Sequence, residues 1–179
     1  IFAKGNLDVH DTLHSLELNG SVVWNGINQA IRERGGGPTV RVRHETSLGS
    51  AAILQARGEI PSVFDGRVLP LDPYPLSTQF GRTLFEVSAD VFVLSIQADL
   101  QMATARHRQQ GFLFNPNDIS RWSEEDREWL FREFEPVPIA SADEGIKALE
   151  AVIMQLRSRT EAPILVYNVS SVVPGEMVH

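Results

Sequence analysis

The run Ala89-Asp-Val-Phe-Val-Leu-Ser-Ile-Gln97 is the strongest indicator of fold class in this chain. It is almost continuously apolar, which is typical of a central strand covered on both faces. A second run, Ala162-Pro-Ile-Leu-Val-Tyr-Asn-Val169, has the same character. Buried strands of this kind occur mainly in parallel sheets with helices on both sides. The two runs therefore predict two central strands of an α/β protein.

Shorter segments around these runs predict further elements. Residues 1–7 predict a first strand, and residues 39–44 alternate apolar and polar side chains, as a strand near a sheet edge does. Residues 24–34 carry apolar side chains at helical spacing, and the three glycines at 35–37 predict where that helix ends. Residues 50–57 predict a short helix.

Two helix starts lie between the central runs. Ser123 precedes Asp126 by three residues, and Ser141 with Glu144 fits a capping box. A helix between two buried strands is typical of the crossover that joins parallel strands. We therefore expect both helices to pack on the sheet. Aromatic side chains near the first helix are expected in that contact, and the alternative is that they line an apolar or sugar-binding surface: Phe112, Phe114, Trp122, Trp129 and Phe131.

Residues 58–83 are rich in proline and glycine, with apolar residues mixed in. A loop of this length inside a compact chain is usually a functional segment. We expect it to form a wall of a pocket.

Composition narrows the classes of function. A chain of 179 residues suits one domain, residues 1–179, with a core large enough to need no disulfide or metal. The formal net charge of −7 disfavours nucleic-acid binding, which needs a basic face. No apolar run approaches the roughly 20 residues of a membrane-spanning helix, so we expect no membrane span.

Cysteine is absent from the sequence, which excludes disulfides, thiolate nucleophiles and cysteine ligands to zinc. The chain begins at Ile1, and no secretory signal is recognisable. These observations leave the compartment undetermined, with a cytoplasmic location favoured, and they predict no oligomeric state.

The order of the predicted elements is typical of a doubly wound, mainly parallel sheet, and such sheets bind ligands beyond the carboxyl ends of their strands. Polar residues follow each predicted strand at that edge, in segments 5–12, 44–49, 97–99 and 168–171. The first segment is the densest in polar and ionisable side chains: Asn6, Asp8, His10, Asp11, Thr12 and, just beyond it, His14. Such residues also cap helices or lie in solvent. Their number at one strand end favours a shared cleft.

Several short blocks resemble those of the SGNH, or GDSL-type, hydrolase superfamily. His10-Asp11-Thr12-Leu13 is similar to the family's Gly-Asp-Ser-Leu block, with threonine in place of the nucleophilic serine. Gly49, after the second predicted strand, resembles the glycine of the family's oxyanion hole. Ile96-Gln97-Ala98-Asp99 stands where the family has Gly-x-Asn-Asp, and only Asp99 matches. By position, Gly5-Asn6-Leu7 also fits the first block, with Leu7 at the nucleophile's place.

The resemblance implies a flavodoxin-like three-layer fold and an ester or acyl hydrolase. Such an enzyme would act on a small-molecule or acylated substrate without a cofactor. In this chemistry a base-activated hydroxyl attacks a carbonyl carbon, and N–H donors stabilise the oxyanion. The implied catalytic residues are Thr12 as nucleophile, with Asp11 and His10 as polar groups of the cleft. His10 is the local base if no carboxy-terminal histidine exists. The implied oxyanion and substrate-binding residues are Gly5, Asn6, Gly49, Gln97 and Asp99.

The family's late Asp-x-x-His block has no clear counterpart after the strand predicted at 162–169. Glu176-Met-Val-His179 has the same spacing but comes one strand too early. The resemblance therefore implies that the sequence lacks the family's last strand and helix and is the amino-terminal part of a longer chain.

Two other functions stay open. Leu7 and Ala98, in place of a nucleophile and an oxyanion donor, favour a catalytically inactive SGNH-like binding module. A metal-dependent hydrolase would draw its ligands from His10, His14, His44 and Asp8. In addition, His107 between Arg106 and Arg108 either holds a carboxylate or phosphate or lies in a solvated basic face.

Overall fold

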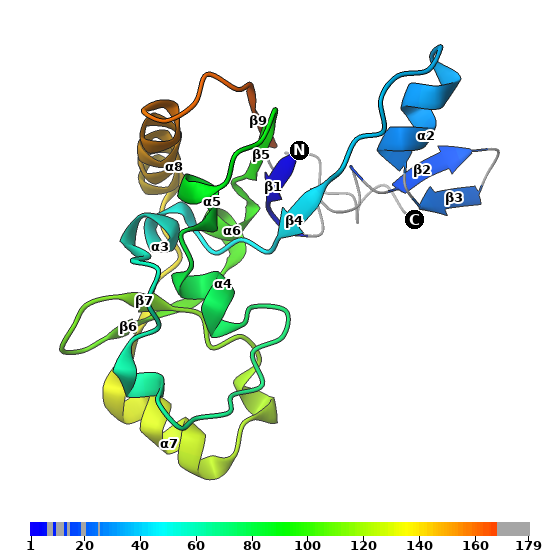
Figure 1. Cartoon of the computed structure of the whole chain (residues 1–179). Coiled ribbons are helices and arrows are strands. Elements are labelled where there is room, and N and C mark those ends of the chain that lie inside the picture. The colour runs from blue at the N-terminus through cyan, green and yellow to red at the C-terminus, as the bar shows by residue number, and fades with distance from the viewer. Residues whose placement is uncertain (7–8, 10–12, 14, 19–20, 25, 168–179) are drawn as a thin grey trace.

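The computed structural model describes residues 1–6, 9, 13, 15–18, 21–24 and 26–167 (Figure 1). At its centre is a four-stranded parallel sheet in the order β4-β1-β5-β9. The strands are β1 (Phe2–Lys4), β4 (Arg43–Glu45), β5 (Phe92–Ser95) and β9 (Ile164–Tyr167). β1 pairs in parallel with both β4 and β5, and β5 pairs in parallel with β9. The strands predicted within 1–7 and 89–97 are thus the two inner strands.

One face of this sheet is covered by α3 (Ser50–Gln55), α5 (Thr83–Glu86) and α8 (Ala142–Arg157). Phe2 and Phe92, from the two inner strands, lie in this layer with their ring centroids 6.2 Å apart. Both side chains are almost completely buried. The hydrophobic effect of burying such rings is a main source of stability for the layer.

The start of α8 matches its sequence signals. The Oγ atom of Ser141 accepts a hydrogen bond from the Glu144 N–H, and the Glu144 carboxylate accepts one from the Ser141 N–H at 2.9 Å. The helix packs on the sheet through Leu149, Val152 and Leu156. The predicted capping box and the expected packing of this helix on the sheet are both confirmed.

The opposite face of the sheet carries a smaller cluster. Its buried members are Ala3, Val9, Leu13 and Val93. Ile27 of α2 (Gly26–Glu33) packs against them. Helices therefore flank the parallel sheet, and the predicted α/β class is confirmed at this level. In the part of the chain described here, no helix is both long and apolar enough to cross a membrane.

A second, antiparallel sheet in the order β7-β6-β8 lies beside the parallel one. Its strands are β6 (Thr104–His107), β7 (Leu113–Phe114) and β8 (Phe134–Val137). These strands and α7 (Glu124–Glu133) form the lower part of Figure 1. They surround what we call the aromatic cluster: Phe64, Leu71, Phe80, Ala105, Phe114, Trp122, Trp129, Leu130 and Phe134.

The expectation that α7 packs on the parallel sheet is wrong. Its buried residues Trp129 and Leu130 belong to the aromatic cluster, and Phe131 is 62 % exposed. The helix itself was predictable, because Ser123 accepts the Asp126 N–H as its N-cap. The antiparallel sheet beside α7 was not predictable. Its strands β6, β7 and β8 are short and β8 contains a proline, so they carry no clear alternation of apolar residues.

A hairpin near the amino terminus was also missed. β2 (Ser15–Leu18) and β3 (Ser21–Trp24) pair in an antiparallel ladder, and α2 begins only at Gly26 instead of at Trp24. The sequence between the two strands is Asn19-Gly20. That dipeptide between two short runs is the strongest local signal for a hairpin, so this element was predictable.

The prediction that β9 is covered on both faces is wrong. Its run predicts a strand covered on both faces, yet Leu165 is 52 % exposed and Val166 is 43 % exposed. Among the described residues, β9 has a hydrogen-bonded neighbour on one side only, which is β5. An apolar run predicts a strand, but it does not tell an inner strand from an edge strand.

Candidate functional site

The candidate site is the carboxyl edge of the parallel sheet. β1, β4 and β5 run in the same direction, so the segments that follow them meet at one edge. Residues 5–6 follow β1, residues 46–49 follow β4, and residues 96–99 follow β5. Five of the predicted site residues lie in these segments: Gly5, Asn6, Gly49, Gln97 and Asp99.

Gly5 allows the elements at this edge to approach closely. A Cβ atom on Gly5 would lie 2.4 Å from Val9 Cγ2 and 2.8 Å from Val9 Cβ, closer than side chains tolerate. Its N–H donates to the Glu45 carbonyl at 3.2 Å, and its carbonyl accepts from His44 Nε2 at 2.9 Å. Both backbone groups of Gly5 therefore tie the end of β1 to β4.

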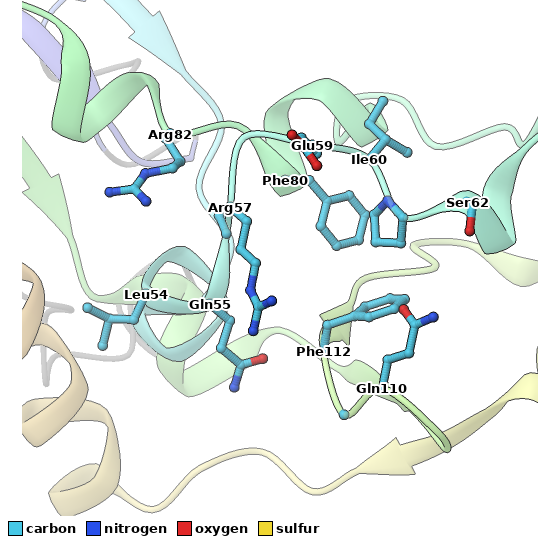
Figure 2. Close-up of a pocket in the computed structure, with 13 residues that line it drawn as sticks. Leu54, Gln55, Arg57, Glu59, Ile60, Ser62, Phe80, Arg82, Gln110 and Phe112 are labelled. Atoms are coloured by element: carbon cyan, nitrogen blue, oxygen red, sulfur yellow. The ribbon is translucent and has the colours of Figure 1, made fainter.

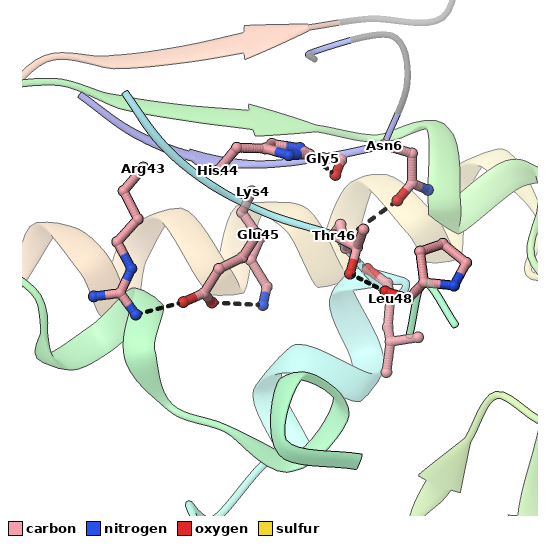
Figure 3. Close-up of polar contacts among 10 residues, drawn as sticks. Lys4, Gly5, Asn6, Arg43, His44, Glu45, Thr46 and Leu48 are labelled. Carbon is pink, nitrogen blue, oxygen red and sulfur yellow. Dashed lines mark hydrogen bonds and ion pairs between the residues drawn. The ribbon is translucent and has the colours of Figure 1, made fainter. Parts of the chain in front are cut away.

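Asn6 and Gln97 present carboxamides near this edge. The Asn6 Oδ1 atom accepts the Ser47 N–H at 3.2 Å, so the donor end of this carboxamide is Nδ2 (Figure 3). The backbone N–H of Gln97 donates to Ser95 Oγ at 3.0 Å. The Gln97 Oε1 atom is buried without a hydrogen-bond partner in the described ranges. Because Ser95 engages the backbone N–H of Gln97, the group of Gln97 that would donate to a ligand is its side-chain Nε2.

Asp99, in α6 (Gln97–Gln101), holds the start of α3. Its two carboxylate oxygens accept from the Ser50 N–H at 2.7 Å and from the Ser50 hydroxyl at 2.8 Å. Two glycines let this happen, since a Cβ on Gly49 would lie 3.3 Å from Asp99 Oδ1 and a Cβ on Gly145 would lie 3.3 Å from Asp99 Cβ. Asp99 thus fixes the backbone at Gly49, the candidate oxyanion donor.

Sequence reasoning missed Ser50 as the partner of Asp99. The signal was partial, because a serine at a predicted helix start suggests a cap, but its partner is 49 residues away. Ser50 is 2 % exposed and both its groups are engaged by Asp99, so its role is structural.

Burial raises the pKa of Asp99 above its ordinary value of 3.8, and the hydrogen bonds from Ser50 only partly offset this effect. Between 3.8 and the raised pKa, the folded protein binds a proton that the unfolded chain has lost, so stability falls as pH rises through this interval. We expect Asp99→Asn to lack this fall. Urea denaturation of both proteins from pH 3 to pH 7 measures the difference, and parallel curves would contradict the assignment.

A buried ion pair lies at the same edge, between β1 and β4. Lys4 Nζ is 3.3 Å from Glu45 Oε2, and Arg43 reaches the other oxygen of Glu45 at 2.8 Å (Figure 3). Lys4 is only 5 % exposed. Burial lowers its pKa from 10.5, and the attraction of Glu45 opposes that shift. This ion pair was not predictable, because Lys4 lies in a run that predicts an apolar strand.

The predicted catalytic residues Thr12, Asp11 and His10 lie outside the described residues, and so do Asp8, His14 and the block 176–179. Their roles stay predictions. His44 is described, and its Nε2 atom bonds the Gly5 carbonyl. Within the described part of the chain, no three His, Asp or Glu side chains gather as metal ligands.

His107 fits neither of its two expected roles. It is 3 % exposed, and its ring stacks on Phe112 at a centroid distance of 4.9 Å. Its Nδ1 atom accepts the Gln110 N–H at 3.0 Å, which stabilises the turn between β6 and β7. His107 is therefore a core residue beside the aromatic cluster. Its sequence neighbours Arg106 and Arg108 suggest an exposed position, but side chains alternate between the two faces of a strand, so His107 points the other way.

Two cavities among the described residues are large enough to hold a small molecule. The larger, of about 950 Å³, lies between the end of α3, the loop that follows it and the β6–β7 turn. Figure 2 shows the Arg57 side chain directed between Gln55 and Phe112. Residues 59–62, 80 and 82 form part of its lining, so the expectation that segment 58–83 walls a pocket is confirmed. The segment is not a loop throughout, because it contains a 3-10 turn at Ser62–Phe64 and the short helix α4 (Leu76–Phe80). The smaller cavity, of about 420 Å³, is lined by Gly49 and Asp99 among others.

No protein-family model, curated protein or solved structure matches this chain. The fold and the site must therefore carry the functional argument by themselves.

Proposed function

We propose that this protein is an SGNH-like ester or acyl hydrolase that acts at the carboxyl edge of its parallel sheet. The observation that carries the proposal is the strand order β4-β1-β5-β9. In chain order this is 2-1-3-4, which agrees with the first four strands of the flavodoxin-like order, whose ligand site lies between strands 1 and 3. Gly5, Asn6 and Gln97 follow the corresponding strands here, β1 and β5.

The proposed reaction uses the Thr12 hydroxyl as nucleophile. Thr12 Oγ1 attacks the substrate's carbonyl carbon while His10 takes its proton, and the same proton then passes to the leaving alcohol. Water, activated by His10, hydrolyses the threonyl ester and restores the hydroxyl. Three N–H donors would stabilise the oxyanion: Asn6 Nδ2, the Gly49 backbone and Gln97 Nε2. Asp99 acts as a positioning residue for Gly49 through its two bonds to Ser50.

The first test is hydrolysis of p-nitrophenyl butyrate by the wild-type chain and by Thr12→Ala. We expect activity above background in the wild type and none in Thr12→Ala, because the variant has no hydroxyl to form the acyl-enzyme. Thr46→Ala is the matched control, since Thr46 Oγ1 donates to the Pro73 carbonyl at 2.9 Å at the same end of the sheet. Equal activity in wild type and Thr12→Ala would refute the proposed nucleophile.

A catalytically inactive binding module is the second candidate. It is favoured by Ala98, which is 3 % exposed and stands where the family has the oxyanion-hole asparagine. Asp99 cannot replace that donor, because both its oxygens accept from Ser50. This candidate predicts that the protein hydrolyses no p-nitrophenyl ester and still binds a small ligand at the sheet edge.

A further inference from the structure

The cavity of about 420 Å³ begins at the proposed site. Gly49, the candidate oxyanion donor, and Asp99, which holds the start of α3, are both part of its lining. The larger cavity shares neither residue and has charged side chains, Arg57, Glu59 and Arg82, around it. A substrate whose carbonyl group lies at Gly49 would therefore extend into the smaller cavity.

The walls of this cavity are mostly apolar and come from helices α3, α6 and α8 and from the antiparallel sheet. Small residues on α3 and α8 leave the space, namely Ala51, Ala52, Gly145 and Ala148. Leu113 of β7 and Val137 of β8 close it from the antiparallel sheet, and Ile139 lies near solvent with 51 % of its surface exposed. A volume of about 420 Å³ lies in the range of small-molecule sites, about 300–1,000 Å³.

We propose that this cavity is the acyl-binding subsite and that the substrate carries a medium-length, unbranched acyl group. The inference rests on the proposed hydrolase function, because that function places the carbonyl at Gly49. The aliphatic chain then contacts α3 and α8 on one side and β7 and β8 on the other. Gln55, Arg106 and Glu144 in the lining are exposed and remain in water, whereas Asp99 is buried with both carboxylate oxygens bonded to Ser50.

Burial of the acyl chain predicts a chain-length dependence. Each methylene that moves from water into an apolar cavity improves binding about fourfold. We expect kcat/KM for p-nitrophenyl esters to rise about fifteenfold from acetate to butyrate, which adds two methylenes. The rise continues to octanoate and stops when the chain no longer fits.

Two variants test the location of the subsite. Ala148→Phe fills the cavity from α8, and Ile139→Ser makes its wall polar at an exposed position where folding is not at risk. Met154→Phe is the matched control on α8, because Met154 is 73 % exposed and outside the cavity. Binding of octanoic acid, followed by titration calorimetry, reports on the subsite independently of hydrolysis.

We expect octanoic acid to bind the wild type and Met154→Phe equally, and to bind Ala148→Phe at least about tenfold more weakly. Ile139→Ser is expected to bind it about threefold more weakly. Octanoic acid binding with this pattern supports the subsite even if no ester is hydrolysed, in which case only the hydrolase function fails. Ester hydrolysis with the same chain-length dependence in all variants would overturn the subsite and leave the hydrolase function standing. No binding of octanoic acid by the wild type would also overturn it.

Discussion

Replacing Phe64 by alanine is expected to lower the free energy of unfolding by about 4 kcal/mol, because it removes the centre of a closely packed core. Phe64 is 3 % exposed, and its ring centroid lies 4.9 Å from that of Phe114 and 5.7 Å from that of Trp129. Phe80 and Phe134 are within 6.0 Å as well. Rings on several sides cannot all move inward, so a cavity remains. Urea denaturation followed by tryptophan fluorescence measures the loss.

Two substitutions serve as controls for the Phe64 prediction. Phe131→Ala removes the same side chain from α7, but Phe131 is 62 % exposed, so its effect is expected within about 0.5 kcal/mol. Phe64→Leu keeps most of the volume and is expected to lose about 1.5 kcal/mol. If Phe64→Ala and Phe131→Ala were equally stable, the packing of the aromatic cluster described above would be wrong.

Replacing Glu45 by glutamine is expected to lower the free energy of unfolding by about 3 kcal/mol at pH 7. The variant leaves the Lys4 ammonium 5 % exposed without the carboxylate that lies 3.3 Å away in the wild type. The expected loss is at the lower end of what breaking a buried ion pair costs, because Glu45 itself is 16 % exposed and water reaches it. Arg43→Gln is the control, since Arg43 is 59 % exposed and its pair is expected to contribute less than about 1 kcal/mol.

The buried Lys4 also predicts how the free energy of unfolding depends on pH. The pKa of Lys4 is lowered in the folded protein, so between that value and 10.5 the unfolded chain binds more protons than the folded one. Stability therefore rises with pH through that interval. We expect Lys4→Met to lack this rise and to be less destabilised than Glu45→Gln, because Glu45 keeps its pair with Arg43. Identical pH profiles for wild type and Lys4→Met would contradict the burial of a charged lysine.

The parts of the fold that were predictable are those with strong local signals. β5 lies in a long apolar run, α8 begins with a capping box, and α3 begins directly after Gly49. The Asn19-Gly20 dipeptide is an equally clear signal for the hairpin of β2 and β3. The antiparallel sheet was not predictable in this way. β6 and β8 carry no clear local pattern, and their packing in the aromatic cluster, through Ala105 and Phe134, stabilises them.

For the candidate site too, residues with a local signal were predictable and their distant partners were not. Gly5, Asn6, Gly49, Gln97 and Asp99 were predictable because each follows a strand, and the position of a strand end is a local property. Their partners were not predictable. Ser50 binds Asp99 and Ser47 binds Asn6 across long stretches of chain, and only the packed sheet brings these groups together. The cavity beside Gly49 likewise exists because α3 and α8 pack near the antiparallel sheet there.

The most direct test of the proposed function is covalent labelling with a fluorophosphonate probe, which reacts with an activated hydroxyl, followed by peptide mass spectrometry. The proposed mechanism predicts one modified residue, Thr12, with labelling abolished in Thr12→Ala and slowed by octanoic acid. Labelling that persists in Thr12→Ala, or a wild-type protein that hydrolyses esters without being labelled at Thr12, would contradict it.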